Sequence, residues 1–304
     1  MTSPGEISEH FIDIEQLFAK KNPGLFKIIP KFIFTYLRKI THLDEINGYI
    51  YRHRDKFGLD FIDAILKEFG VQTELSTPPP SPESHTPPPS PPLKSGEGNK
   101  GRGTLSDLIS PTGRYIIASN HPLGGMDGMA LIQVVGKVRK DIVFPVNDIL
   151  TYIPGLSPLF IPINKHGKNT ENIAIIDQTF ASDKVILYFP AGLVSRKHKG
   201  GTIKDLEWKK TFISKSKKYK RDVIPVYITG RNTEFFYNLS RWRSRLGIKA
   251  NIEMLFLVDE MVKQKGKTLK MIFGEPIPYS FFDKSRTDVQ WAEYVREKVY
   301  DLKR

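Results

Sequence analysis

A proline-rich stretch early in the chain separates two parts that must fold differently. Nine of the 22 prolines lie between Thr77 and Pro92, where Thr-Pro-Pro-Pro-Ser-Pro occurs twice, beginning at Thr77 and at Thr86. Proline has no backbone N–H and a fixed φ, so this stretch can build neither helix nor sheet. We predict a linker or loop insertion at residues 75–104, with recognition by a proline-binding domain as the alternative.

The residues before this linker are expected to be helical. Apolar side chains recur at helical spacing over residues 11–18, and residues 44–69 continue as one or two helices. Residues 24–37 mix apolar residues with lysines, which suits a helix on a membrane surface or, alternatively, a buried helix pair with solvated lysines. We see no run of eighteen apolar residues and no signal peptide, so no membrane-spanning segment is expected.

Residues 105–304 show a pattern of strands alternating with helices. The helical stretches are 170–181, 206–219 and 288–302. The strand candidates are short apolar runs at 115–119, 141–146, 159–163, 184–189, 223–229, 252–258 and 269–273. This order predicts an α/β fold: a mixed, largely parallel sheet flanked by helices and preceded by the N-terminal helical segment, 1–74.

One strand-end loop has the residues needed for acid–base chemistry. Asn120 and His121 follow the run at 115–119, Gly124 and Gly125 come next, and Asp127 stands six positions after the histidine. A neutral imidazole can take a proton from a hydroxyl near pH 7, and a carboxylate on its other nitrogen would fix the tautomer. We predict His121 and Asp127 as a catalytic pair, because the glycines let the backbone turn back.

Composition limits the remaining chemistry. The chain has no cysteine, which excludes disulfides and thiol acyl-enzymes, and its net charge of +13 predicts an anionic partner. Two basic clusters, 215–221 and 241–245, are either solvated faces or binding sites for anionic lipid headgroups or nucleic acid. Metal-ligand spacing is absent from the sequence, so no metal site is predicted.

Four blocks follow one another along the chain: Asn120–Gly128, Leu159–Lys165, Tyr188–Lys197 and Val223–Gly230. In this order they resemble the PlsC-type glycerolipid and lysophospholipid acyltransferases, in particular their bacterial hemolysin-like branch of amino-acid-lipid O-acyltransferases. The family usually has four residues between histidine and aspartate, and here there are five. Lys165 stands where the family has an arginine, and Ala191 stands where it has a glutamate.

The resemblance implies a membrane-associated enzyme of lipid biosynthesis that moves an acyl group from acyl-CoA or acyl-carrier protein to a lysolipid hydroxyl. No other cofactor and no nucleic acid are expected, and the protein would be peripheral on the cytoplasmic side of an anionic membrane. Besides Asn120, Gly124 and Gly125, the residues implied to bind substrate come from the second and third blocks: Lys165, Phe189, Pro190, Ala191, Gly192, Ser195, Arg196 and Lys197.

The identity of the acceptor lipid leaves several alternatives for the function. A lysine can hold a carboxylate as well as a phosphate, so an N-acyl amino acid of the glycine or ornithine type is predicted. The alternatives are a 1-acylglycerol-3-phosphate acyltransferase that makes phosphatidic acid, and a non-catalytic basic lipid-binding protein. A serine hydrolase that uses Ser119 or Ser195 is less well supported, because neither serine lies in a Gly-x-Ser-x-Gly segment.

Overall fold

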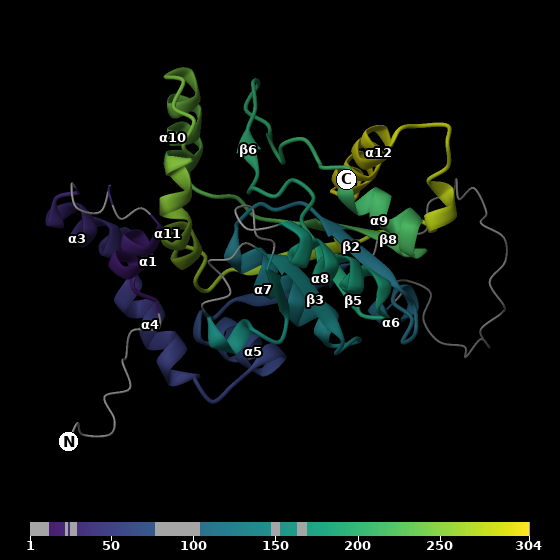
Figure 1. Ribbon diagram of the computed structural model, residues 1–304, viewed down its shortest axis with the longest axis horizontal. Coiled ribbons are helices and arrows are strands. Elements are labelled where there is room, and N and C mark those ends of the chain that lie inside the picture. Colours follow the sequence, from purple (N-terminus) through teal and green to yellow (C-terminus); the bar gives the residue numbers. More distant parts are fainter. Residues whose placement is uncertain are drawn as a thin grey trace.

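The centre of the molecule is a seven-stranded sheet covered by helices on both faces (Figure 1). The computed structural model describes residues 12–21, 24, 29–76, 104–146, 153–162 and 169–303. Most of the predicted linker, including the whole proline-rich stretch, lies outside these residues, so the linker stays a prediction. In the described part of the chain, we find no helix with the length and apolar character needed to cross a membrane.

The sheet is mixed and largely parallel, as predicted. Five neighbouring strands run parallel, β9 is antiparallel to β8, and β1 is parallel to β9. In spatial order the strands are β1 (Gln72–Ser76), β9 (Thr268–Phe273), β8 (Asp222–Ile228), β2 (Tyr115–Ser119), β5 (Val185–Tyr188), β3 (Ile142–Val146) and β4 (Phe160–Pro162).

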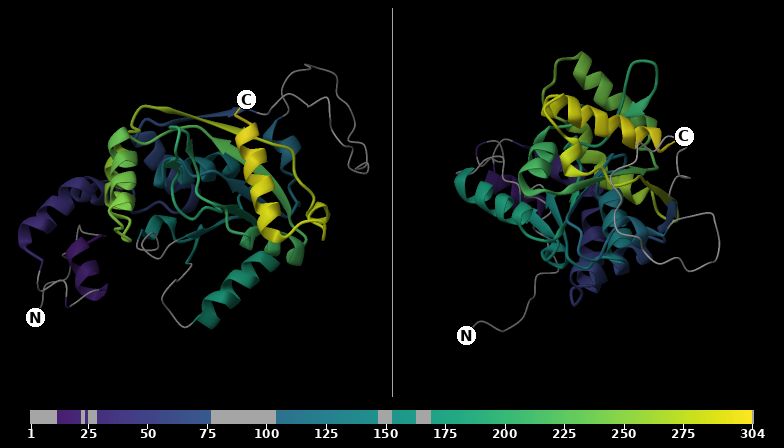
Figure 2. Two further views of the ribbon diagram at one scale, coloured as in Figure 1. Left: turned by 90° about the horizontal axis from the view of Figure 1, so that it is seen from above. Right: turned by 90° about the vertical axis from the view of Figure 1, so that its right-hand side faces the viewer.

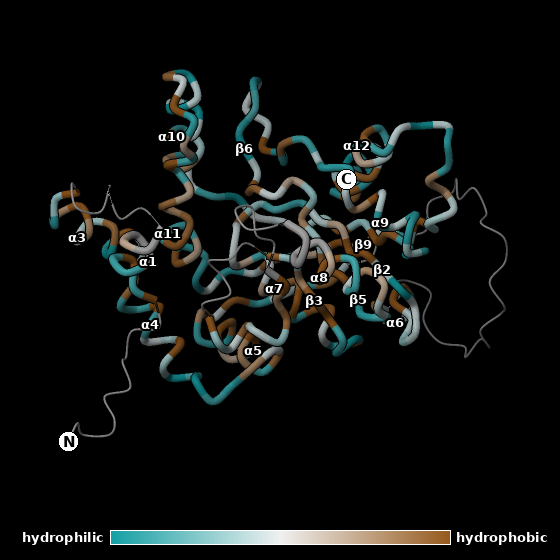
Figure 3. The backbone as a smooth tube through the Cα atoms, in the orientation of Figure 1, coloured by the Kyte–Doolittle hydropathy of each residue, from teal (hydrophilic) through white to brown (hydrophobic). Residues whose placement is uncertain are grey.

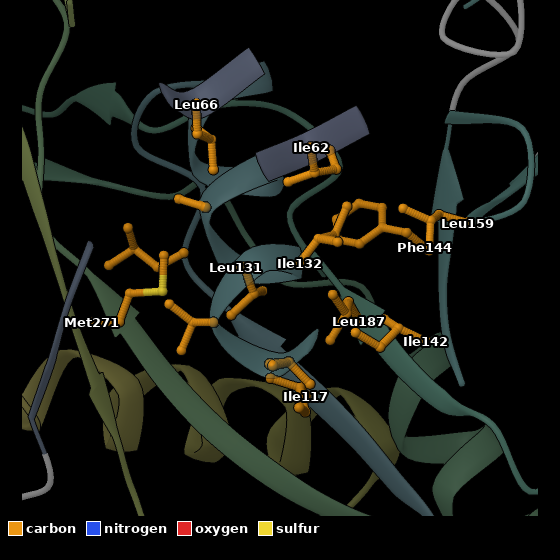
Figure 4. Close-up of a cluster of buried hydrophobic side chains, with 14 of the residues drawn as sticks. Ile62, Leu66, Ile117, Leu131, Ile132, Ile142, Phe144, Leu159, Leu187 and Met271 are labelled. Atoms are coloured by element: carbon orange, nitrogen blue, oxygen red, sulfur yellow. The ribbon is translucent and has the colours of Figure 1, made fainter. Parts of the chain in front are cut away.

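Alternation along the buried strands supplies two cores. Ile117 of β2 belongs to the core under α5 (Gly58–Glu68) and α7 (Gly125–Gly136), whereas Ile116 belongs to the core on the opposite face. Figure 4 shows Ile62 of α5, Leu131 of α7 and Leu187 of β5 within one cluster of buried side chains. The opposite face is covered by α8 (Asn169–Ala181), α9 (Thr211–Tyr219) and α12 (Asp288–Asp301). The short helix α6 (Leu105–Leu108) leads into β2.

The N-terminal part of the chain is not a separate unit. Residues 72–76 form the edge strand β1, and Ile62 and Leu66 of α5 are fully buried in the core that α7 shares. The division drawn at residue 74 therefore cuts through the sheet. Three further helices, α1 (Ile14–Lys21), α3 (Lys31–Ile40) and α4 (Leu43–Arg52), lie beside the domain, and both Figure 1 and Figure 2 place α3 close to α10 and α11.

One predicted strand is wrong. Residues 252–258 form the 3-10 helix η3 (Ile252–Phe256) and the start of α11 (Leu257–Val262), since a short apolar run suits either structure. Helix α10 (Glu234–Arg245) and the hairpin of β6 (Arg196–Lys197) and β7 (Ile203–Lys204) were not predicted. Two more 3-10 turns, η2 (Pro154–Leu156) and η4 (Tyr279–Phe281), lie in connections.

Candidate active site

Three neighbouring parallel strands bring the predicted site together. The strands β5, β2 and β8 are adjacent, so their carboxyl ends meet at one edge of the sheet. His121 follows β2, Phe189 follows β5, and Gly230 follows β8. A Cβ on Gly230 would lie 2.8 Å from the Leu123 side chain, so the third strand end touches the loop that carries His121.

His121 and Asp127 form the predicted pair. Nδ1 of His121 lies 3.0 Å from Oδ1 of Asp127, and the backbone N–H of Leu123 donates to Oδ2 at 2.7 Å. The Asp127 side chain is completely buried, while His121 remains 17% exposed. A carboxylate on Nδ1 places the proton there, so Nε2 is left with a lone pair that can accept a proton.

The two glycines make the loop geometry feasible. Gly124 has φ 90°, a region that side-chain-bearing residues rarely adopt, and Gly125 is the first residue of α7. The loop therefore turns directly into the helix that carries Asp127 in its first turn. Both glycines are also closely approached, because a Cβ on either would lie 3.4 Å from Leu257 or Met261.

The third block forms a wall beside the histidine. The ring of Phe189 stacks on His121 with 4.0 Å between centroids, and Phe144 packs edge-on against Phe189. A turn closed by the Gly192 N–H and the Phe189 carbonyl at 3.0 Å follows, with Pro190 inside it. Ala191, at the position of the family's glutamate, is buried in the core under α9 and α12.

Two residues predicted to bind substrate instead brace the loop. The side-chain amide of Asn120 forms two hydrogen bonds with the backbone of Ile228. Its Oδ1 accepts from the Ile228 N–H at 2.7 Å, and its Nδ2 donates to the Ile228 carbonyl at 2.9 Å. Ser195 donates its backbone N–H to the His121 carbonyl at 2.7 Å. Its Oγ donates to Asp205 at 2.6 Å, so neither side chain is free for substrate.

Asp205 is a residue that the sequence analysis missed. It is fully buried and accepts the backbone N–H of His121 at 3.2 Å, the Ser195 hydroxyl, and the Trp208 indole N–H at 2.9 Å. Burial raises the pKa of the Asp205 carboxyl, although these donors oppose the shift. It joins the loop after β2 to the segment after β5. An isolated aspartate between a lysine and a leucine gives no sequence signal for this role.

The structure corrects the prediction that Arg196 belongs to an anion-binding cluster. Arg196 is buried, and its Nη2 donates to the fully buried Glu253 at 2.8 Å, so its charge is already matched. Lys197 is paired with Glu234 at 2.7 Å. Lys165 lies outside the described residues, and its predicted role is left open. A different cation, Lys209, lies near the third block, with Nζ 3.1 Å from the place a Cβ would occupy on Gly192.

The alternative nucleophiles are not placed for catalysis. The Oγ of Ser119 donates to the neighbouring Asn120 carbonyl at 3.0 Å and is fully buried. Ser195 faces the backbone carbonyl of His121 rather than its ring. Within the described ranges, no three His, Asp or Glu side chains are grouped so that they could hold a metal ion.

Comparison with known proteins decides the family. The profile described as Acyltransferase matches residues 101–304. The chain is 43% identical over 293 residues to "Lyso-glycine lipid O-acyltransferase" of Bacteroides thetaiotaomicron, which covers 96% of this chain and 97% of that protein. The chain belongs to the acyltransferase family. The acyltransferase is also 41% identical to the protein of the same name from Phocaeicola vulgatus, over 96% of this chain and 95% of that one.

These comparisons confirm the resemblance found in the four sequence blocks. They support an enzyme rather than a non-catalytic lipid-binding protein. Among solved structures, the acyltransferase is similar to the 1-acyl-sn-glycerophosphate (LPA) acyltransferase, PlsC, from Thermotoga maritima. That match has 16% identity and a TM-score of 0.44 and covers 90% of this chain and 97% of the other.

Proposed function

We propose that this acyltransferase moves a fatty acyl group from an acyl thioester to the hydroxyl of a lyso-glycine lipid. The observation that carries the proposal is the likeness to two relatives with that name over nearly the whole of each chain. The geometry supports it, because a base suited to a hydroxyl stands at the edge of the sheet with its partner carboxylate fully buried.

The reaction is a single transfer without an acyl-enzyme. Nε2 of His121 removes the hydroxyl proton while the oxygen attacks the thioester carbonyl. Backbone amides of the loop around Gly124 and Gly125 stabilise the oxyanion. The C–S bond then breaks, and the leaving thiolate takes the proton from the imidazolium. Asp127 holds His121 in the right tautomer and stabilises its charged form.

Lys209 is the cation that we assign to the acceptor's carboxylate. It follows the segment that Asp205 ties to His121, and its backbone N–H donates to the Pro190 carbonyl at 3.1 Å. Its side chain is exposed and reaches the turn at Gly192. An ammonium serves as a point charge and suits a carboxylate, whereas a bidentate guanidinium would suit a phosphate better.

A competition between acceptors tests this assignment. With one acyl thioester and equal amounts of lyso-glycine lipid and lysophosphatidic acid, we expect O-acylated glycine lipid to dominate the products. The product ratio reports the ratio of kcat/KM values. Lys209→Met should reduce that ratio by roughly tenfold, about 1.4 kcal/mol, and exposed Lys210→Met is the matched control. A tenfold preference of the unaltered protein for lysophosphatidic acid would return it to the phosphatidic-acid branch.

The acceptor is a lipid, so we also place the protein at the cytoplasmic face of an anionic membrane. Helices α3 and α10 and the turn η3 carry several exposed large apolar residues: Phe32, Tyr36, Phe235, Trp242 and Leu255. Figure 3 shows hydrophobic positions along α3 and α10, away from the sheet. Exposed basic residues of α3, such as Lys31 and Lys39, would face headgroups.

Vesicle binding tests this placement. At low salt we expect strong binding to vesicles that contain anionic lipid, and a steep decrease as ionic strength rises. The double change Phe32→Ser and Trp242→Ser should weaken binding at least about tenfold, because two large apolar side chains leave the interface. Phe57→Ser, at an exposed aromatic beside α5, is the control. Equal binding to neutral and anionic vesicles at low salt would contradict the electrostatic part.

A further inference from the structure

A basic cleft stands beside the active site, between the β6–β7 hairpin and α10. It has a volume of about 450 Å³, and no acidic side chain lines it. The lining residues are Arg196, Lys197, His198, Lys199, Leu206, Ser240, Arg241, Arg243, Ser244 and Arg245. The hairpin follows β5 and α10 follows β8, which are the two strands that flank β2. Hairpin and helix rise side by side from the edge that carries His121 (Figure 1).

The floor of the cleft is a buried ion-pair network. Glu253 of η3 accepts from Arg196 of the hairpin at 2.8 Å and from Arg243 of α10. Burial alone would raise the pKa of Glu253, but the Arg243 hydrogen bond and the charge of Arg196 lower it. Two arginines thus hold one carboxylate, which fixes the spacing of the two walls and leaves an excess of positive charge.

The rim of the cleft has cations without carboxylate partners. In the part of the chain that the structure describes, Lys199, Arg241 and Arg245 form no ion pair, while Lys197 shares Glu234 with Arg231. The other basic cluster, in α9, differs. There Lys215 and Lys218 are paired with Asp177, and Lys217 is paired with Asp288. Three cations that line the cleft thus remain available to an anionic ligand.

We propose that the cleft binds the phosphate groups of the nucleotide moiety of an acyl-coenzyme A donor. Arginine and lysine side chains are the usual ligands of phosphate, and the volume suits a small molecule rather than a protein surface. The nucleotide is separated from the thioester by the long pantetheine arm. Its phosphates must therefore bind apart from His121 but on the same edge of the sheet, as this cleft does. The inference rests on the proposed function only in taking the donor to be a thioester.

Binding of coenzyme A itself tests the proposal. Titration calorimetry should give a dissociation constant that rises at least about tenfold in the triple variant Lys199→Glu, Arg241→Glu, Arg245→Glu. The KM for acyl-coenzyme A should rise similarly, with the KM for the lysolipid unchanged. The control is Lys137→Glu, Lys140→Glu, Lys184→Glu, with the same charge change at exposed residues beside the opposite ends of the strands. It should bind coenzyme A as the unaltered protein does.

Several outcomes would overturn the cleft proposal. One is equal coenzyme A binding by all three proteins. A second is an activity loss confined to acyl-carrier protein as donor, which would assign the cleft to an acidic protein. A third is weaker vesicle binding by the triple variant alone, with coenzyme A binding unchanged, which would assign it to headgroups. An acyl thioester of N-acetylcysteamine, which has no phosphate, tests the proposed function separately from the cleft. If neither this donor nor any other acyl thioester acylates the lysolipid, the proposed function itself has failed.

Discussion

Replacing His121 with alanine is expected to reduce acyl transfer by at least about a thousandfold, with the fold retained. In the proposed mechanism the imidazole takes the proton, and positioned general bases contribute factors of this size. The loss should fall on kcat rather than on the KM for either substrate. Initial rates with labelled acyl thioester, beside thermal unfolding of the same samples, measure both effects.

The control for this change is another histidine. His53 pairs with Glu68 near the end of α4, away from the strand ends, and His53→Ala should keep full activity. The His121 side chain is only partly exposed and stacks on Phe189, so some loss of thermal stability is expected with alanine. Turnover by His121→Ala within a few-fold of the unaltered protein would remove the proposed mechanism.

Asp127→Asn is expected to reduce transfer by roughly a hundredfold, less than the loss of His121. Both carboxylate oxygens of Asp127 accept hydrogen bonds, one from His121 and one from the Leu123 N–H. An amide has a single acceptor oxygen. If that oxygen keeps Leu123, the NH₂ faces Nδ1 and favours the tautomer with its proton on Nε2, which cannot act as the base.

The unfolding free energy should also fall, by about 1–3 kcal/mol, because one buried hydrogen bond is lost or reversed. A pH profile of kcat distinguishes the two effects, since a purely structural change would lower the rate without moving the profile. Asp63→Asn is the matched control, because the Asp63 side chain is exposed and pairs with Gln133 far from the loop. An Asp127→Asn protein with unchanged kcat would mean that His121 needs no partner.

The strands and the contact between His121 and Asp127 could be predicted because their signals are local. The apolar runs at 115–119 and 223–229 are strands with bounds shifted by at most one residue. His121 and Asp127 stand six positions apart across a glycine turn, so chain connectivity alone brings them close. The four blocks could be recognised for the same reason, since each lies on a strand or directly after one.

The residues that support the site could not be predicted because their partners are distant in sequence. Asp205 meets His121 across 84 positions, and Arg196 meets Glu253 across 57. The burial of these charges depends on tertiary packing, and a basic residue beside a serine gives no sign of a partner carboxylate. Likewise, β1 pairs with β9 across the whole domain, so a helical reading of residues 1–74 could not anticipate an edge strand.

One measurement tests the central claim most directly: mass spectrometry of the lipid formed by the purified protein from a synthetic lyso-glycine lipid and an isotope-labelled acyl thioester. We predict O-acylated glycine lipid that carries the labelled chain, with free thiol released in equal amount and none of this product from His121→Ala. Labelled free fatty acid as the main product, or no labelled lipid at all, would contradict the account.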